Sequence, residues 1–193
     1  MSLQPLEIIC HFYPEDTALR RLLILHSEKV RDKAFSILEH ARTVKGGDAF
    51  ASLDMRLVND GALLHDIGIG QTDAPGILCQ GVEPYICHGT LGAAMLRAFD
   101  PSLEAEARIC ERHTGAGLSV QDILEQQLPI WPVRDLLPET PEERLVCLAD
   151  KFFSKSGDPS QEKSFDRVRR SMMKFGSASL ARFDAMCDEF CIK

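Results

Sequence analysis

Residues 61–70 read GALLHDIGIG, an apolar stretch that ends in an adjacent histidine and aspartate and is followed by two glycines. Two interpretations of His65 and Asp66 are open from this stretch alone. The pair either closes a helix, with Gly68 in a left-handed turn behind it, or supplies two metal ligands. An isolated pair favours the helix cap, so metal-ligating residues elsewhere in the chain must decide.

Apolar residues recur at spacings of three and four along most of the chain, which is the pattern of helices packed on a core. No alternating run is long enough for a sheet, so the sequence predicts an all-α fold. We expect helices from about 17 to 44, from 52 or 54 to 66, from 88 to the Asp100-Pro101 break, and over 103–113, 119–125, 140–153, 161–174 and 178–191, with a loop over 68–84.

The 193 residues are most simply one domain, residues 1–193, with a motif-bearing core of about 17–155 and a helical C-terminal extension over 160–193. Capping residues support the helix that begins at Thr140: Pro141 suits the first helical position and Glu143 completes a capping box. No apolar run approaches the roughly 18 to 20 residues of a membrane span, and the N-terminal stretch does not resemble a secretory signal. We therefore expect a cytoplasmic protein.

The net charge of −7 argues against a broad nucleic-acid surface, which requires a dense lysine and arginine face. A short anionic ligand is compatible with this charge if metal ions supply a local positive field. Seven cysteines include no CxxC pair, so we expect reduced, mostly buried thiols. Cys187 and Cys191, four residues apart on one helix face, are a weak candidate for a separate metal site.

Five potential metal ligands stand in apolar helical surroundings. Four are histidines, His26, His65, His88 and His113, and the fifth is Asp150 within LVCLADKFF. A single histidine on an apolar face is usually an ordinary core residue, but a single buried aspartate is costly unless it is paired or bound to a metal. Five such residues without a common purpose would make an unusual core.

The order of these residues resembles the H…HD…D pattern of the HD-domain metal-dependent phosphohydrolase superfamily, and LLHDIG resembles its HDIG variant. HGTLGAAML, ICERHTGAGL and LADKFF resemble the further histidine and aspartate motifs of its two-metal members. The likeness covers about residues 20–155 and is closest to small stand-alone HDIG hydrolases. Many HDIG proteins carry lysine or another polar residue after the motif, whereas Ile69 and Gly70 stand here, so a phosphate contact at that position is doubtful.

The resemblance implies a helical bundle with two divalent ions, each iron, manganese, zinc or nickel. One ion would be held by His26, His65, Asp66 and Asp150, and the other by Asp66, His88, His113 and water. Imidazole and carboxylate together suit these metals. Two divalent ions and two carboxylates leave about two positive charges, which describes a cavity for an anion.

Residues that would contact a bound phosphate are chosen by their position beside these ligands. Lys29 shares a helix face with His26 and Lys151 follows Asp150, so we predict catalytic roles for Lys29 and Lys151 together with Asp66. Further candidates for lining the site or contacting the substrate are Gly89, Thr90, Arg112, Thr114, Gly115, Tyr85 and Trp131.

The sequence therefore predicts a metal-dependent phosphohydrolase of a nucleotide or another small phosphorylated compound, with metal-activated water as the attacking group. The alternative is an HD-domain di-iron oxygenase, because some HD-domain proteins use the same ligand order to activate oxygen. A non-catalytic binding module is a third hypothesis, which the complete ligand set disfavours. We expect no membrane partner and no extended nucleic acid, and a homodimer remains open.

Overall fold

The computed structural model describes residues 4–193, and its architecture is all-α, as the sequence predicts. Residues 1–3 of the expected domain lie outside the described part. The helices of residues 4–193 are α1 (Pro5–Phe12), α2 (Ala18–Lys45), α3 (Met55–Leu64), α4 (His88–Phe99), α5 (Glu104–Arg112), α6 (Val120–Glu125), α7 (Pro141–Asp150), α8 (Phe165–Met172) and α9 (Ser177–Glu189).

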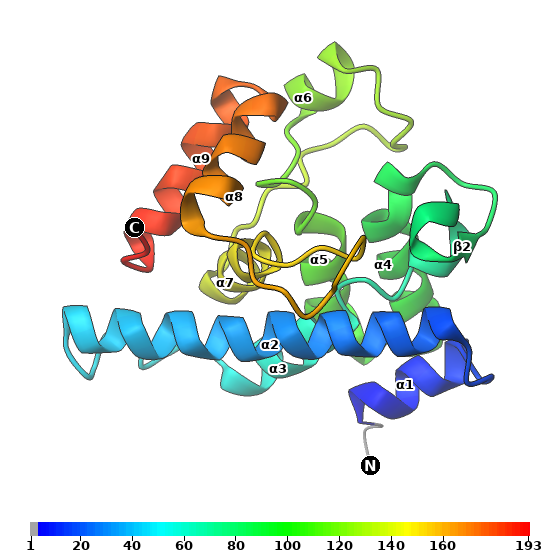
Figure 1. The fold of residues 1–193 in the computed structure, drawn as a ribbon, viewed down its shortest axis with the longest axis horizontal. Helices are drawn as coiled ribbons and strands as arrows, with labels where there is room; N and C mark the ends of the chain where they lie inside the picture. The colour runs from blue at the N-terminus through cyan, green and yellow to red at the C-terminus, as the bar shows by residue number, and fades with distance from the viewer. Residues whose placement is uncertain (1–3) are drawn as a thin grey trace.

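Helix α2 runs along one edge of the molecule in the view of Figure 1, and most of the other helices lie on the same side of it. Thr17 begins this helix, since its hydroxyl accepts a hydrogen bond from the Arg20 amide at 3.1 Å. Gly46 ends it with a φ of 105°, a conformation that favours glycine. The predicted helix of 17–44 is therefore found within a residue of its expected ends.

Helices α3, α5 and α7 pack against one another beside α2, and α4 pairs closely with α5. One apolar cluster lies between α2, α3, α7, α8 and α9, and a second lies between α1, α2, α4 and α5. His26 lies between two fully buried positions of α2, Leu23 and Val30, and Asp150 follows a run of buried residues in α7. Core packing thus carries both side chains into the interior.

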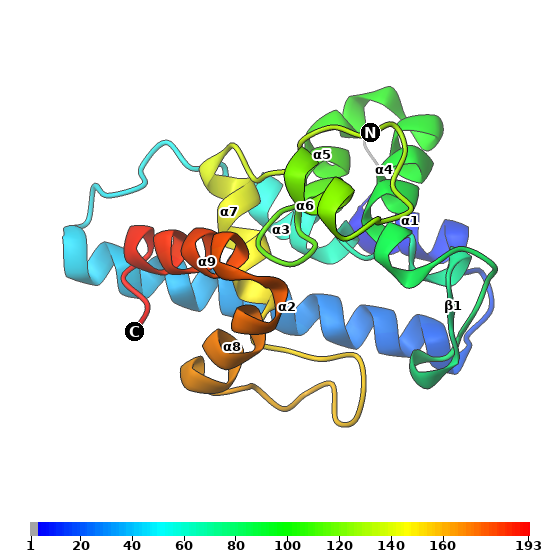
Figure 2. The ribbon, with the colours of Figure 1, turned by 90° about the horizontal axis from the view of Figure 1, so that it is seen from above.

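The C-terminal extension folds back beside the central helices as α8 and α9 (Figure 2). An ion pair between Arg169 and Asp184, at 2.8 Å, joins these two helices, and Val168 and Met172 bury the inner side of α8. Residues 151–164 link α7 to α8 and pass beside α2, where Lys33 pairs with Glu162 at 2.5 Å. This segment lies next to the candidate site described below.

Three predictions about secondary structure were wrong in detail. Helix α1 was missed, because eight residues contain too few turns for a clear periodicity. The expected loop over 68–84 contains a small hairpin, in which β1 (Asp73–Ala74) pairs antiparallel with β2 (Cys79–Gln80), and two residues are too short for an alternating pattern. Helix α8 begins at Phe165 and not at 161, because Ser164 caps it. Within residues 4–193, no helix has the length and apolar character needed to cross a membrane.

Candidate metal centre

The potential metal ligands lie mostly at helix ends. His65 and Asp66 follow α3, His88 begins α4, His113 follows α5 and Asp150 ends α7. A helix end brings a side chain to the edge of the packed core, and its last carbonyl groups have no helical hydrogen-bond partner. His26, in the middle of α2, completes the group from the side.

Three of the histidines donate from Nδ1 to the backbone carbonyl oxygen three residues earlier in the chain. His65 Nδ1 donates to the Ala62 oxygen and His113 Nδ1 to the Cys110 oxygen, each at 2.7 Å and each three residues back in the chain. His88 makes the equivalent bond to Tyr85 at 2.7 Å. A hydrogen on Nδ1 leaves the lone pair of Nε2 free to bind a metal, which is the usual role of such a second hydrogen bond.

The first group of ligand atoms comes from His26, His65, Asp66 and Asp150. Asp66 Oδ2 lies 3.2 Å from His26 Nε2 and 3.0 Å from His65 Nε2. Asp150 Oδ1 lies 3.1 Å and 3.5 Å from the same two nitrogens. Ligands around an ion at zinc-like bond lengths are separated by about 3.0 to 3.4 Å, so the spacing of this group fits a bound cation.

The second group consists of Asp66, His88 and His113. Asp66 Oδ1 lies 3.4 Å from the Nε2 atoms of both histidines, and these two Nε2 atoms are 2.9 Å apart. Since Nδ1 carries the hydrogen in each ring, two lone pairs face each other across this short distance. A cation between them would remove that repulsion. Asp66 therefore offers one oxygen to each group, as a ligand shared by two ions does.

Burial and charge at Asp66 also fit a cation. Asp66 is fully buried, and neither of its oxygens accepts a well-directed hydrogen bond within the described residues, although charged groups lie close by. Burial would raise the pKa of this carboxyl, but His65 and Lys155 hold it well below its ordinary value. The group is therefore an anion inside the core, which requires positive charge nearby.

The histidines of the two groups differ in charge. Burial would lower the pKa of His65, but Asp66 and Asp150 outweigh it and raise this pKa to about 9. Burial and the neighbouring His113 lower the pKa of His88 to about 3, and burial lowers the pKa of His113. At neutral pH the second group is thus already deprotonated for metal binding, whereas His65 must first lose a proton.

The glycine that ends the HDIG motif, Gly68, packs tightly against α4. A β-carbon on Gly68 would lie 2.2 Å from the His88 carbonyl oxygen and 2.4 Å from the Gly92 amide nitrogen. Gly68 has a φ of −85°, so the left-handed cap considered from the sequence was wrong. Tyr13 holds the same turn, because its hydroxyl donates to the Ile67 oxygen at 2.6 Å and accepts from the Gly70 amide at 3.0 Å.

Lys155 is the site residue that sequence reasoning missed. Its Nζ lies 2.6 Å from Asp66 Oδ2, and only 9% of its side chain is exposed. Burial would lower the pKa of this amine, but Asp66 and the nearby Tyr85 and Asp150 raise it well above its ordinary range. Lys155 lies five residues beyond the end of α7, where helical spacing no longer indicates which way a side chain points.

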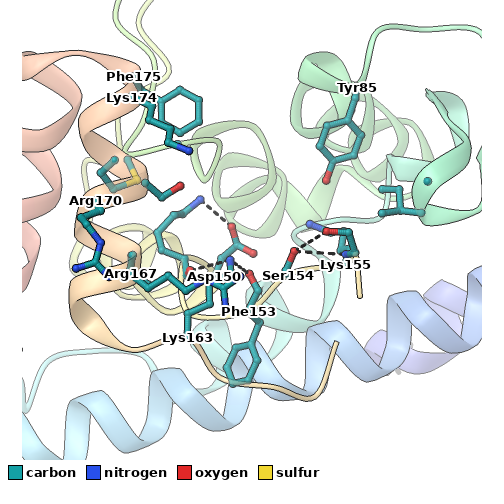
Figure 3. Close-up of a pocket in the computed structure, with 18 of the residues that line it drawn as sticks. Tyr85, Asp150, Phe153, Ser154, Lys155, Lys163, Arg167, Arg170, Lys174 and Phe175 are labelled. Carbon is teal, nitrogen blue, oxygen red and sulfur yellow. Dashed lines mark hydrogen bonds and ion pairs between the residues drawn. The ribbon is translucent and has the colours of Figure 1, made fainter. Parts of the chain in front are cut away.

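Two cavities meet at this cluster. The larger has a volume of about 1070 Å³ and lies between the segment 150–156, α8 and Tyr85 (Figure 3). The smaller has a volume of about 300 Å³, is bordered by His88 and His113, and is mainly apolar. Both are lined by Asp150, Lys151 and Lys155, so a ligand in either can reach the same charged groups.

The structure places the predicted phosphate-contacting residues in different surroundings. Lys151 lines both cavities, and its Nζ donates to Asp150 Oδ2 at 2.7 Å and to the His113 carbonyl oxygen at 2.9 Å. Lys29 is half-buried on α2 and lines neither cavity. Arg112 is turned toward Leu137 and Glu139, away from the ligands.

Some of the other residues predicted to line the site border the two cavities, and others do not. Tyr85 stacks on the His88 ring at 4.6 Å and lines both cavities, as does Gly115, and Thr114 lines the smaller one. Trp131 is 86% exposed and lies outside both cavities. Gly89 packs against the Cys110 carbonyl group, and the Thr90 hydroxyl donates to the Cys87 carbonyl oxygen at 3.0 Å, which are structural contacts.

Two buried cysteines donate to the backbone carbonyl groups of histidine ligands. All seven cysteines are free, and the Cys110 and Cys147 thiols donate to the carbonyl oxygens of His65 and His113. Within residues 4–193, the groups with metal-binding spacing do not include Cys187 or Cys191. The separate cysteine site considered from the sequence therefore has no structural support.

Comparison with known proteins gives one family match and several relatives. The HD domain family matches residues 23–154, which contain every ligand of the two groups. An uncharacterized protein of Methanocaldococcus jannaschii is 37% identical over 145 residues, which are 71% of this chain and 73% of that protein. No solved structure gives a significant match.

Two further relatives are longer proteins named tRNA (cytidine(56)-2′-O)-methyltransferase. The one from Picrophilus torridus is 37% identical over 138 residues, which are 69% of this chain and 35% of that protein. The one from Thermoplasma volcanium is 28% identical over 160 residues, which are 83% of this chain and 40% of that protein. This chain therefore matches well under half of either. Its ligand order, its helical fold and the family match together show that the chain belongs to the HD domain family.

Proposed function

We propose that this protein is a metal-dependent phosphohydrolase that acts on a small phosphorylated compound, with a nucleotide as the favoured class. The observation that carries the proposal is the position of Asp66, whose two oxygens each face a separate group of imidazole nitrogens. Divalent ions bound there would lower the pKa of a water molecule and neutralise charge on a phosphate. The protein's own side chains would bind and orient the phosphate.

Lys151 and Lys155 are suited to hold the phosphate. Both border the two cavities, and their amines lie beside the acidic ligands at Asp150 and Asp66. An amine so placed can turn from its carboxylate to a phosphate oxygen once metal ions satisfy the carboxylate. Lys29, predicted from the sequence to act in catalysis, would reach the substrate only after moving, because it lines neither cavity.

The tRNA methyltransferase names belong to proteins of which this chain matches 35% and 40%, and we do not extend methyl transfer to it. They do make RNA-derived phosphates a reasonable part of any substrate screen. The donor set is one of imidazoles and carboxylates beside a cavity with several basic residues, which suits hydrolysis of an anion.

The proposal is tested by metal analysis together with a substrate screen. Protein prepared without added metal is analysed for bound iron, manganese, zinc and nickel, and then assayed for phosphate release. The panel contains nucleoside mono-, di- and triphosphates, sugar phosphates, and nucleoside 2′- and 3′-phosphates. We expect close to two ions per chain and phosphate release that EDTA abolishes and added metal restores.

Metal-loaded protein that cleaves none of these compounds would contradict the hydrolase. An aerobic preparation whose electron spin resonance spectrum shows a mixed-valent iron pair, with oxygen uptake and no phosphate release, would favour the oxygenase instead. Purified protein with no metal at either group, even after exposure to each ion, would remove the basis of both activities.

A further inference from the structure

The larger cavity has more cationic groups than a single phosphate requires. Its lining includes six basic residues, Lys151, Lys155, Lys163, Arg167, Arg170 and Lys174, and one acidic residue, Asp150. This is a strong local excess in a chain whose net charge is −7. A volume of about 1070 Å³ is also at the upper end of what small-molecule sites usually offer. The cavity is therefore built for a ligand that extends beyond the metal centre.

The basic residues divide into an inner and an outer set. The three inner lysines are already engaged: Lys151 and Lys155 contact acidic ligands, and Lys163 donates to the carbonyl groups of Lys151 and Phe153. The outer set, Arg167, Arg170 and Lys174, is exposed. Within residues 4–193, none of its charged groups forms a hydrogen bond or ion pair, so their positive charge is available.

The outer set lies along one side of α8 and borders the cavity. Arg167, Arg170 and Lys174 are spaced by three and seven residues along α8 and the turn that follows it, which places them on one side. Val168 and Met172, on the buried side of α8, also border the cavity. Figure 3 shows the outer set on one side of the cavity and Tyr85 and Lys155 on the other, with Asp150 between them.

The outer set belongs to the C-terminal extension and lies beyond the residues that match the HD domain family, which end at 154.

The smaller cavity offers an apolar surface beside these charges. Its lining includes Ile86, Leu118 and Leu128, and it joins the larger cavity at the metal centre and at Phe175. A compound with a planar apolar part and more than one phosphate would fill both spaces.

We propose that Arg167, Arg170 and Lys174 form a second anion subsite, which selects nucleotides with at least two phosphate groups over nucleoside monophosphates. One phosphate lies at the metal centre, the second contacts the outer set, and the base occupies the smaller cavity. The proposal rests on the proposed function for the position of the first phosphate. Arginine is well suited to this role because its planar guanidinium binds phosphate oxygens in pairs.

The test compares binding of three probes to manganese-loaded protein by isothermal titration calorimetry. The probes are AMP, adenosine 3′,5′-bisphosphate and ATP, with magnesium in excess over ATP so that it does not remove the bound metal. At least one of the two compounds with several phosphates should bind ten times more tightly than AMP. Arg167→Gln/Arg170→Gln should abolish that advantage and change the AMP dissociation constant by less than twofold.

Arg21→Gln/Arg56→Gln is the matched control, because it removes the same charge from residues that do not line the cavity. The control should keep the preference for several phosphates. Which of the two larger probes gains affinity reports whether the subsite reads a phosphate chain or a phosphate across the ribose. Equal loss of affinity in both double variants would show a general charge effect and overturn the subsite.

Two other results would also overturn it. One is an unchanged preference in Arg167→Gln/Arg170→Gln. The other is tighter binding of hexadeoxythymidylate than of either polyphosphate probe, lost in the same variant, which would assign the face to nucleic acid. These measurements report binding alone, so they remain decisive even if none of the compounds is hydrolysed. Conversely, phosphate release with no contribution from the two arginines would refute the subsite and leave the hydrolase intact.

Discussion

The Nε2 atoms of His88 and His113 lie 2.9 Å apart, although both rings carry their hydrogen on Nδ1. Two neutral acceptors do not approach this closely without something positive between them. Protonation is disfavoured, because burial lowers the pKa of both rings. The pair is therefore arranged for a metal ion, and each ring is fixed by a backbone carbonyl group.

Replacing His113 by Ala should remove one ion and leave the other. The second group would retain only two ligands, Asp66 and His88, while the first group would keep all four. Metal analysis should show a fall from about two ions per chain to about one. His40→Ala, which changes an exposed histidine outside both groups, is the control and should retain both ions. Loss of both ions in His113→Ala would argue against two separate positions.

Replacing Asp66 by Ala should empty both positions, because this is the side chain that both groups share. Asp66→Asn is the second variant, since it preserves shape while removing the anion that a cation requires. Both should bind less than about a tenth of the native metal, whereas Asp73→Ala, an exposed acid on β1, should bind the native amount. Circular dichroism establishes that each variant is folded. Full metal content in a folded Asp66→Asn protein would contradict the shared-ligand assignment.

Metal binding near neutral pH should release a proton from His65. Its pKa is about 9 in the presence of Asp66 and Asp150, so the ring is charged at pH 7 and must become neutral to bind a metal. Apparent metal affinity should therefore rise with pH between 6 and 9. Titration calorimetry in two buffers of different ionisation enthalpy measures the proton directly. Heats that do not depend on the buffer would contradict a charged His65.

The sequence predicted the helices well and the arrangement of the ligands only through resemblance. Periodicity identifies long amphipathic helices such as the one predicted over 17–44, and the capping residues Thr140 and Pro141 identify the start of α7. Which helix ends meet in space depends on long-range packing, which has no local signal. His65 and Asp150 are 85 residues apart in the numbering and 3.5 Å apart at their nearest polar atoms.

The features that sequence reasoning could not reach are those set by loops. Lys155 follows the end of α7, where the chain has no period that indicates a direction, so its contact with Asp66 could not be foreseen. A left-handed turn at Gly68 belonged to one of the two interpretations left open by the sequence, because glycine is frequent in that role. Its true constraint is the close approach of another backbone segment, which only the folded structure shows.

Replacing Gly68 by Ala should destabilise the fold and displace the metal centre. The added carbon would press on the backbone of α4 at His88 and Gly92, and backbone atoms cannot move aside as a flexible side chain does. We expect a loss of roughly 3 kcal/mol, or roughly 6–12 °C in melting temperature for a chain of this size. Gly47→Ala is the control, because nothing lies within 4 Å of a β-carbon there. Equal melting temperatures for the two variants would show that the contact is easily relieved.

Replacing Lys155 by Met should strengthen metal binding and slow turnover. The Lys155 amine, 2.6 Å from Asp66 Oδ2, competes with a metal ion for that oxygen and repels it. Its removal should therefore tighten metal binding about tenfold, or about 1.4 kcal/mol. If the amine also stabilises the phosphate, kcat/KM should fall roughly 100-fold in the same variant. Lys45→Met, on the exposed end of α2, should change neither quantity. A Lys155→Met protein with weakened metal binding would mean that the amine supports the centre, and unchanged turnover would remove it from the reaction.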